Sequence, residues 1–276
     1  MQNYIQVSVV AETEDQKEAY SAFLFELGAE GTEEHADGVF GYFPESDYVA
    51  NAVSQSLMEL CSEWKTQFST TVIPPTNWNA EWESNYPPVI LEGYCTIAAD
   101  FHTQLPEVPF PIRIHPKMSF GTGHHSTTEQ MLRMMQHIDF TGKSVFDFGC
   151  GTGILGILAA KKGAARVVGN EIEDWSVENA RDNAAINAVQ MDVRLGGMEV
   201  IPETDFDYCL ANINKHVLLE FMPQISGCVR SQATLWMSGI YVHDIADIRE
   251  KAEQFGLEYV HNTELNEWAC IEFRKL

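Results

Sequence analysis

The alternation of apolar and polar residues divides this chain of 276 residues into a short first part and a longer second part. In the first part, residues 4–10 alternate as in a half-buried strand, and residues 68–73 form a β-branched run. The spacing of Thr13 and Gln16 is that of a capping box, which predicts a helix beginning there. The elements expected are strand, helix, strand, strand, helix and strand, over residues 4–10, 13–28, 29–35, 38–43, 44–61 and 68–73. This βαββαβ order predicts a small α+β, ferredoxin-like domain over residues 1–75.

In the second part, strand and helix patterns alternate along the chain. Strands are expected at 144–148, 165–171, 191–195, 206–212, 233–239, 256–261 and 268–273, and helices at 153–162, 174–187, 214–224 and 243–255. Such alternation predicts a parallel sheet covered by helices on both faces. A short polar connection joins the last two strands, which predicts an antiparallel edge. The fold class expected is therefore α/β, with a Rossmann-like domain of seven strands.

The segment Pro74-Pro75 breaks the pattern and marks a boundary between the two parts. Three aromatic residues then follow at intervals of four: Trp78, Trp82 and Tyr86. This spacing places the three rings on one face of a linker helix predicted over 76–88. Packing of that face on a core is favoured over an aromatic platform for a ligand. The second domain is predicted to span residues 89–276 and to begin with strands in 89–116.

A glycine-rich segment, Asp147-Phe-Gly149-Cys-Gly151-Thr-Gly153-Ile-Leu-Gly156, lies between the first strand and the first helix of this alternation. A strand that enters a helix through glycines lets a ligand lie against bare backbone at the helix N-terminus. The pattern Asp-x-Gly-x-Gly-x-Gly resembles the first motif of Rossmann-like S-adenosylmethionine (SAM) methyltransferases. It also contains the dinucleotide pattern Gly-x-Gly-x-x-Gly, so the turn alone predicts a nucleotide-type pocket without naming the ligand.

Two carboxylates bear on the choice of ligand. Glu171 ends the second strand of the alternation, 20 residues after Gly151, where an acid can bind ribose hydroxyls. SAM and NAD both contain this ribose, so Glu171 does not distinguish them. Asp147 lies just before the turn, where a negative charge favours a cationic sulfonium and amino group over a dinucleotide phosphate. Asp147 therefore favours SAM.

The strand expected at 206–212 ends in Asn212, and Asn214 follows two residues later. The carboxyl ends of parallel strands line the ligand crevice, where the Asn212 side chain can accept a hydrogen bond from a substrate N–H. Asn214 is predicted to cap the next helix, which leaves Asn212 free. By contrast, Asn179, Asn183 and Asn187 recur at intervals of four along one helix and are predicted to be surface and C-terminal cap residues.

A second glycine-rich segment, Ser119-Phe120-Gly-Thr-Gly-His-His-Ser126-Thr-Thr128-Glu129, precedes a predicted helix. Ser126 is expected to cap this helix, with Glu129 completing a capping box. The loop glycines and Thr128 are placed to fold over a cofactor, with Phe120 beside them. His124 and His125 are adjacent and point apart on an extended loop, and no Cys/His set has ligand spacing. Packing and hydrogen bonding are therefore favoured for both over metal binding, and no metal site is predicted.

The chain carries 40 acidic and 17 basic residues, for a net charge of −23. Residues 1–75 contain 13 acidic and two basic residues, a net of −11. Such a chain repels nucleic acid and anionic membranes, and attracts basic partners. A solubilising acidic face is the commoner meaning of this excess, and a docking surface for a basic macromolecule is the alternative. The six cysteines lack Cys-x-x-Cys spacing, and no apolar leader or membrane-spanning run occurs, which predicts a cytoplasmic protein with reduced thiols.

Taken together, five segments resemble the PrmA-type ribosomal protein methyltransferases, which methylate the large-subunit ribosomal protein L-eleven. In chain order the segments are Trp78-x-x-x-Trp82, Ser119-Phe-Gly-Thr-Gly-His-His-Ser-Thr-Thr128, Asp147-Phe-Gly-Cys-Gly-Thr-Gly-Ile-Leu, Asn183-Ala-Ala-Ile-Asn187 and Ala211-Asn212-Ile213. The resemblance runs from about residue 77 to the C-terminus. The loop at 119–128 is its most specific part, because SAM enzymes in general lack it.

The resemblance implies SAM as cofactor, with contacts at Thr128, Gly149, Glu171 and Asn212. Two further contacts, Asp147 and Gly151, are expected from the turn itself. The resemblance also implies a basic ribosomal protein as partner, recognised by the N-terminal domain, and no direct binding of nucleic acid. A monomer is expected. Two positions depart from the family pattern: Glu171, where Asp is usual, and Asn214-Lys215-His216, where small apolar residues are usual.

The implied reaction is N-methylation of lysine ε-amines and an N-terminal α-amine. No dedicated base is evident, so Asn212 is predicted to orient the amine while its proton passes to water. One alternative is a SAM methyltransferase that acts on another basic protein or a small amine. Less favoured alternatives are an NAD(P)-dependent oxidoreductase and a non-catalytic binding protein on the same fold.

Overall fold

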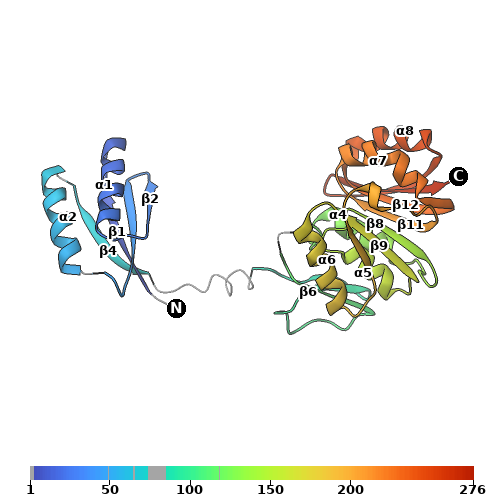
Figure 1. The fold of residues 1–276 in the computed structure, drawn as a ribbon, viewed down its shortest axis with the longest axis horizontal. Helices are drawn as coiled ribbons and strands as arrows, with labels where there is room; N and C mark the ends of the chain where they lie inside the picture. Colours follow the sequence, from blue (N-terminus) through green and yellow to red (C-terminus); the bar gives the residue numbers. More distant parts are fainter. Residues whose placement is uncertain (1–2, 49, 65, 74–84, 118) are drawn as a thin grey trace. The chain divides into compact units, whose positions relative to one another are not determined.

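The computed structural model describes residues 3–48, 50–64, 66–73, 85–117 and 119–276, without the side chains of 50–52 and 61–64. The chain forms two compact units, Met1–Asn85 and Tyr86–Leu276, which are drawn in Figure 1. Of the predicted linker helix over 76–88, Trp78 and Trp82 lie outside the described residues, and residues 85–88 form no helix. None of the described helices is long and apolar enough to cross a lipid bilayer.

The first unit contains one four-stranded sheet with the strand order β2-β3-β1-β4. Its elements are β1 (Tyr4–Val10), α1 (Glu14–Glu26), β2 (Gly31–His35), β3 (Gly38–Pro44), α2 (Ala50–Trp64) and β4 (Phe68–Ile73). The capping box of Thr13 and Gln16 is present at the start of α1. Alternate residues of β1, Ile5, Val7 and Val9, form one buried core with residues of both helices. Both helices therefore cover the same face of the sheet.

The second unit contains a seven-stranded sheet with the order β10-β9-β8-β11-β12-β14-β13. Its strands are β8 (Ser144–Phe148), β9 (Arg166–Glu171), β10 (Asp192–Leu195), β11 (Phe206–Asn212), β12 (Val229–Tyr241), β13 (Leu257–Leu265) and β14 (Trp268–Lys275). The first five run parallel, whereas β14 pairs antiparallel with both β12 and β13. This mixed sheet confirms the predicted α/β class, and the last two strands form the antiparallel edge.

Helices cover both faces of the seven-stranded sheet (Figure 1). The helices are α4 (Ser126–Met134), α5 (Ile154–Lys161), α6 (Asp174–Ile186), α7 (Lys215–Gly227) and α8 (Ile245–Gln254). One core joins α7 and α8 to strand residues that include Phe146 and Phe206. A second core joins α4 and α5 to Val145 and to a three-stranded sheet of β5 (Val89–Leu91), β6 (Cys95–Ala99) and β7 (Phe110–Ile114). The residues that alternate along β8 therefore pack into different cores.

Three local predictions were wrong. The second helix of the first unit begins at Ala50 and not at Pro44. The residue that caps α4 is His125 and not Ser126, because the His125 Nδ1 accepts the amide hydrogen of Thr127. The third error concerns Asn179, Asn183 and Asn187, which are buried and not on the surface, although Asn187 is the C-cap residue of α6, as predicted.

The buried asparagines fasten α6 to neighbouring backbone. Asn183 donates to the carbonyl oxygen of Thr152 at 2.9 Å and accepts the amide hydrogen of His115 at 2.8 Å. Asn187 exchanges two hydrogen bonds with the backbone of Arg113, and Asn179 donates to Ser119. An amide side chain has both donors and acceptors, so it can replace missing backbone partners in this way. The row of asparagines therefore holds α6 against β7 and the glycine-rich turn.

Candidate functional site

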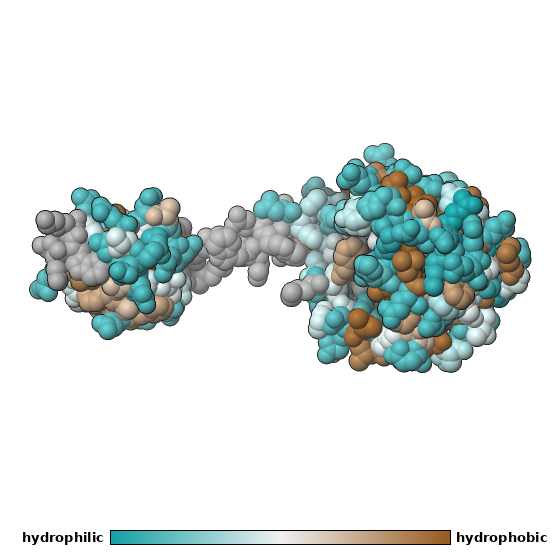
Figure 2. Space-filling view, turned by 90° about the horizontal axis from the view of Figure 1, so that it is seen from above, coloured by the Kyte–Doolittle hydropathy of each residue, from teal (hydrophilic) through white to brown (hydrophobic). Residues whose placement is uncertain are grey.

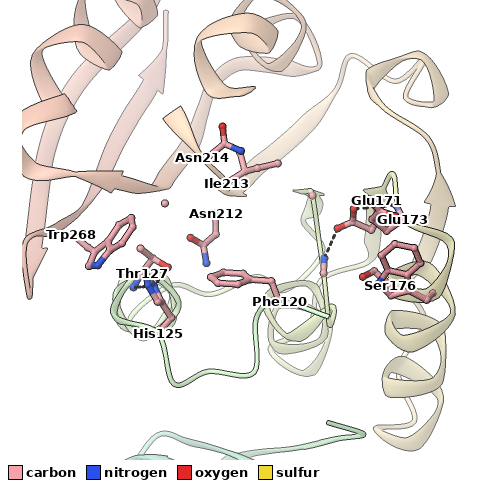
Figure 3. Close-up of a pocket in the computed structure, with 14 residues that line it drawn as sticks. Phe120, His125, Thr127, Glu171, Glu173, Ser176, Asn212, Ile213, Asn214 and Trp268 are labelled. Atoms are coloured by element: carbon pink, nitrogen blue, oxygen red, sulfur yellow. Dashed lines mark hydrogen bonds between the residues drawn. The ribbon is translucent and has the colours of Figure 1, made fainter. Parts of the chain in front are cut away.

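A cavity of about 450 Å³ lies at the carboxyl ends of the parallel strands. It is lined by Phe120, His125, Thr127, Gly149, Gly151, Glu171, Glu173, Trp175, Ser176, Asn212, Ile213, Asn214, Gly239 and Trp268. Figure 3 shows Glu171 and Glu173 on one side of this cavity, Trp268 and His125 on the opposite side, and Asn212 and Phe120 between them. Segments far apart in sequence thus meet at the edge where α/β sheets bind ligands.

The glycine-rich turn forms the floor of this cavity. Gly149 and Gly151 have φ values of 65° and 53°, in the left-handed region that glycine adopts at little cost. The amide of Gly151 donates to the Glu171 carboxylate at 3.1 Å, the bond drawn in Figure 3. The other carboxylate oxygen of Glu171 accepts the amide hydrogen of Ile172 at 2.7 Å. The turn and the acid predicted to bind ribose are therefore held together.

The loop before α4 is fastened onto the turn by Thr152. The Thr152 amide donates to the carbonyl oxygen of Phe120 at 3.0 Å, and its hydroxyl donates to that of Gly121 at 2.6 Å. Ser119 is buried and accepts hydrogen bonds from Ser176 and Asn179 of α6. These bonds leave the Phe120 ring 58% exposed at the cavity. The loop thus folds back onto the turn.

Asn212 ends β11 with its amide side chain directed into the cavity (Figure 3). The side-chain nitrogen donates to the Thr128 hydroxyl at 3.2 Å, whereas the buried oxygen, Oδ1, has no partner among the described residues. A buried acceptor without a partner is unfavourable, so this oxygen is ready to receive a donor from a bound molecule. Asn214 accepts the amide hydrogen of Val217 and so caps α7, which confirms that capping does not occupy Asn212.

Both loop histidines make hydrogen bonds. His125 shares a 2.8 Å hydrogen bond with the Thr127 hydroxyl, and its ring meets Trp268 edge-on at 4.7 Å. The Nε2 atom of His124 bonds the carbonyl oxygen of Pro87 at 2.8 Å. Among the described residues, no group of His, Cys, Asp and Glu side chains is arranged to hold a metal ion. His125 therefore connects the start of α4 to the cavity wall.

Lys215, one of the residues that depart from the family pattern, points away from the cavity. Its ammonium lies 2.6 Å from carboxylate oxygens of both Asp244 and Asp247. These ion pairs join the start of α7 to the start of α8 and raise the pKa of Lys215. Lys215 is therefore a link between two helices and does not line the cavity.

Asp147 lies beneath the turn and is 1% exposed. Its carboxylate accepts the amide hydrogen of Gly156 at 2.9 Å and borders a small inner cavity, shared with Phe120, Thr128 and Asn212. Burial raises the pKa of Asp147, the Gly156 hydrogen bond lowers it and the nearby Glu171 charge raises it, so that the pKa lies at about 7. A cation placed nearby would favour the ionised form.

The substitution Asp147→Asn should flatten the dependence of stability on pH. An unfolded aspartate ionises near pH ~3.9, so the folded chain binds the Asp147 proton more tightly. The stability that this proton contributes is present in full below about pH 4 and is lost as pH rises through about 7. The amide of the variant would not titrate but would still accept from Gly156. Between pH 5 and 8 the free energy of unfolding, measured with urea, should fall by about 2 kcal/mol more for the wild type than for the variant. Equal losses would contradict a buried, titrating Asp147.

Several lining residues were not predicted from the sequence. Trp268 comes from the start of β14, the strand next to the edge strand β13, Gly239 from within β12, and Thr127 from the helix start where Thr128 was expected. Thr128 lines the inner cavity instead. Only Gly239 gave a clue in the sequence, because a glycine within a strand often marks a close approach of backbone. Its φ is 84°, and a Cβ there would lie 2.4 Å from the carbonyl oxygen of Ile213. Trp268 and Thr127 had no signal, because their role depends on which segments meet.

The site fits a nucleoside cofactor. At Gly151 a Cβ atom would lie 2.4 Å from the carbonyl oxygen of Phe120, so only bare backbone can form this floor. An acid lies beside it at the end of β9, and Asn212, whose side-chain oxygen has no partner among the described residues, lines the same cavity. The fold and the site define a Rossmann-like methyltransferase. The whole chain from residue 2 to 276 matches the model of the family described as ribosomal protein L11 methyltransferase (PrmA), and the chain belongs to this family.

Relatives of similar length support the assignment. The chain is 37% identical over 257 residues to the ribosomal protein L11 methyltransferase of Phocaeicola vulgatus, covering 92% of each protein. It is 38% identical over 259 residues to that of Porphyromonas gingivalis, covering 92% of this chain and 89% of the relative. A solved structure of ribosomal protein L11 methylase from Lactobacillus delbrueckii subsp. bulgaricus matches with a TM-score of 0.63 and 25% identity, over 69% of this chain and 100% of that chain.

Proposed function

We propose that this chain transfers methyl groups from SAM to lysine ε-amines and to the N-terminal α-amine of ribosomal protein L11. The observation that carries the proposal is that Asn212, which lines the cavity, has a buried side-chain oxygen without a partner among the described residues. An amine N–H is the donor that this acceptor lacks. Membership of the family supports the proposal independently.

Bound SAM would supply a methyl group already activated by its sulfonium. The residues proposed to hold it are Gly149 and Gly151 through backbone, Glu171 through its carboxylate, and Phe120, Thr128 and Asp147 around the inner cavity. Glu171 keeps a lone pair for a ribose hydroxyl on Oε2, which accepts one hydrogen bond, from the Gly151 amide, whereas Oε1 accepts those of Ile172 and Glu173 among the described residues. Asp147 would supply negative charge beneath a cationic ligand.

Asn212 is proposed to orient the reacting amine. Thr128 accepts from the Asn212 nitrogen and so directs Oδ1 toward the cavity. A free lysine amine with pKa ~10.4 is neutral in roughly one molecule in 2,500 at pH 7, so the site must select the neutral form. The amine proton is proposed to pass to water, and the contribution of the chain is alignment of the nitrogen with the methyl group.

Residues 1–75, which belong to the first unit, are proposed to form a ferredoxin-like domain that recognises the protein substrate. Its net charge of −11 complements a basic ribosomal protein. On the face drawn in Figure 2, hydrophilic residues cover most of both units. A charged, hydrated surface of this kind attracts a basic partner at long range and loses that attraction as salt screens it.

Salt should therefore weaken binding of the protein substrate far more than binding of SAM. Raising KCl from about 50 to about 300 mM is expected to raise KM for L11 about tenfold and KM for SAM less than about twofold. Steady-state methyl transfer at a series of salt concentrations measures both constants. A KM for L11 that does not change with salt would remove the electrostatic role of the first unit.

The function is tested by mass spectrometry of ribosomal proteins from cells with and without this gene. Methyl groups on L11 lysines and its N-terminus should disappear without the gene and return when purified protein and SAM are added. Methylation of another basic protein or a small amine in the same assay would favour the first alternative. Thermal stabilisation by NADH but not by S-adenosylhomocysteine would favour an oxidoreductase.

A further inference from the structure

A second, open groove of about 550 Å³ adjoins the main cavity on the antiparallel edge of the sheet. We call it the hairpin groove; its residues are Val242, His243, Glu264, Leu265, Asn266 and Glu267. Both hollows are bordered by the same two segments, because Gly239 and Trp268 line the cavity, whereas Val242, three residues after Gly239, and Glu267, directly before Trp268, line the groove. The amide of Val242 donates to the carbonyl oxygen of Glu267 at 2.9 Å, which joins the two walls.

Aromatic rings connect the groove to the cavity. His243 stacks on Tyr241 with ring centroids 5.3 Å apart, and Tyr241 stacks on Trp268 at 4.1 Å. Trp268 meets His125, whose ring lies 5.6 Å from that of Phe120. Tyr241 is 42% exposed in the middle of this row. The row therefore forms an exposed, continuous path from the groove to the position of Asn212.

The wall of the groove carries acids. Glu264 and Glu267 are both exposed, and Glu264 accepts a hydrogen bond from Asn262 at 3.1 Å, but within the described residues neither acid forms an ion pair. Glu267 has a φ of 67° after Asn266 at 50°, in a two-residue turn between β13 and β14 where glycine is the favoured second residue. A glutamate with a left-handed φ lowers the stability of the turn relative to a glycine, so the Glu267 side chain does not stabilise the turn.

We infer that the hairpin groove binds the basic segment of the protein substrate that flanks the target amine, with Glu264 and Glu267 facing its cations and Tyr241 beneath its chain. This inference rests on the proposed function and adds a subsite to it. Lysine and arginine side chains pack their stems on aromatic faces while their charges meet carboxylates. The occupant is a basic peptide because the groove is acidic and continues directly into the cavity where an amine is expected.

The inference is tested by titrating the full-length protein, with S-adenosylhomocysteine present, with a synthetic lysine-rich peptide from L11 that contains one target lysine. Glu267→Gln removes the charge. Tyr241→Leu removes the aromatic face but keeps an apolar side chain. Glu267→Gly removes the charge and also the energetic cost of a left-handed φ in a residue with a side chain. The matched control is Glu258→Gln, an exposed acid on the same strand β13 outside the groove. The first two variants should each weaken peptide binding about fivefold, and the control less than about twofold.

Glu267→Gly should weaken peptide binding as much as Glu267→Gln does. It should also raise the Tm by roughly a few degrees, because glycine adopts the left-handed φ of this turn position without strain. A lower affinity together with higher stability would separate a binding role from a structural one. If the wild type, Glu267→Gln and Tyr241→Leu bound the peptide with equal affinity, the hairpin groove would not be the binding site of the peptide, even if L11 is methylated normally. Peptide binding that depends on Glu267, without methyl transfer to any ribosomal protein, would uphold the groove and overturn the proposed function.

Discussion

Asn212→Ala should lower kcat/KM for methyl transfer by about 100-fold while the protein stays folded. The substitution removes the acceptor that faces the cavity, so the amine would no longer be held in line with the methyl group. The rest of the cofactor site is untouched, and the dissociation constant of S-adenosylhomocysteine should rise far less. Transfer of labelled methyl groups to L11 and calorimetric titration measure the two effects.

The neighbouring Asn214→Ala is the control for Asn212→Ala. Asn214 also lines the cavity, but its Oδ1 accepts the amide hydrogen of Val217 and caps α7, so Asn214→Ala should lower stability by about 1 kcal/mol and lower kcat/KM far less than Asn212→Ala. Thr128→Val tests the orientation of Asn212, because it removes the hydroxyl that accepts from Nδ2. Thr128→Ser keeps that hydroxyl and should restore most of the activity. An unchanged kcat/KM in Asn212→Ala would remove Asn212 from the mechanism.

Gly151→Ala should abolish measurable cofactor binding and lower the free energy of unfolding by about 2–4 kcal/mol. Two costs coincide at this position. The backbone has a φ of 53°, and the new Cβ would lie 2.4 Å from the carbonyl oxygen of Phe120. Because the obstacle is backbone, relief requires movement of the loop or of the turn, and either movement disturbs the cavity floor. Titration with S-adenosylhomocysteine and urea unfolding measure both losses.

Gly142→Ala separates the two costs. Gly142 also has a left-handed φ, of 74°, but a Cβ there would meet nothing within 4 Å. In this variant the free energy of unfolding should fall by only about 1 kcal/mol, and cofactor binding should be unchanged. If Gly151→Ala proved no more harmful than Gly142→Ala, the close contact between turn and loop would not hold the site together.

Local patterns predicted much of the framework because they depend on neighbours in sequence. The capping box at Thr13, the parallel strands that end at Glu171 and Asn212, and the cap at Asn214 were all recognised from residues a few positions apart. The same reasoning failed at Ser126, which was predicted to cap α4. The side chain of His125, one residue earlier, accepts the amide hydrogen of Thr127 and caps the helix instead. Helical spacing also misled at Asn183, where the periodicity was correct and the burial was not.

The sequence by itself determined that glycines and a carboxylate meet in a nucleotide-type turn, since that contact spans one strand, one helix and one further strand. Only the tertiary structure decided that Trp268 and Gly239 complete the cavity, that the Asn212 oxygen lacks a partner among the described residues, and that α6 is fastened through buried amides. These features depend on contacts between segments tens of residues apart. Periodicity and capping rules describe the forces within an element, and they contain no information on which distant side chain fills the remaining space.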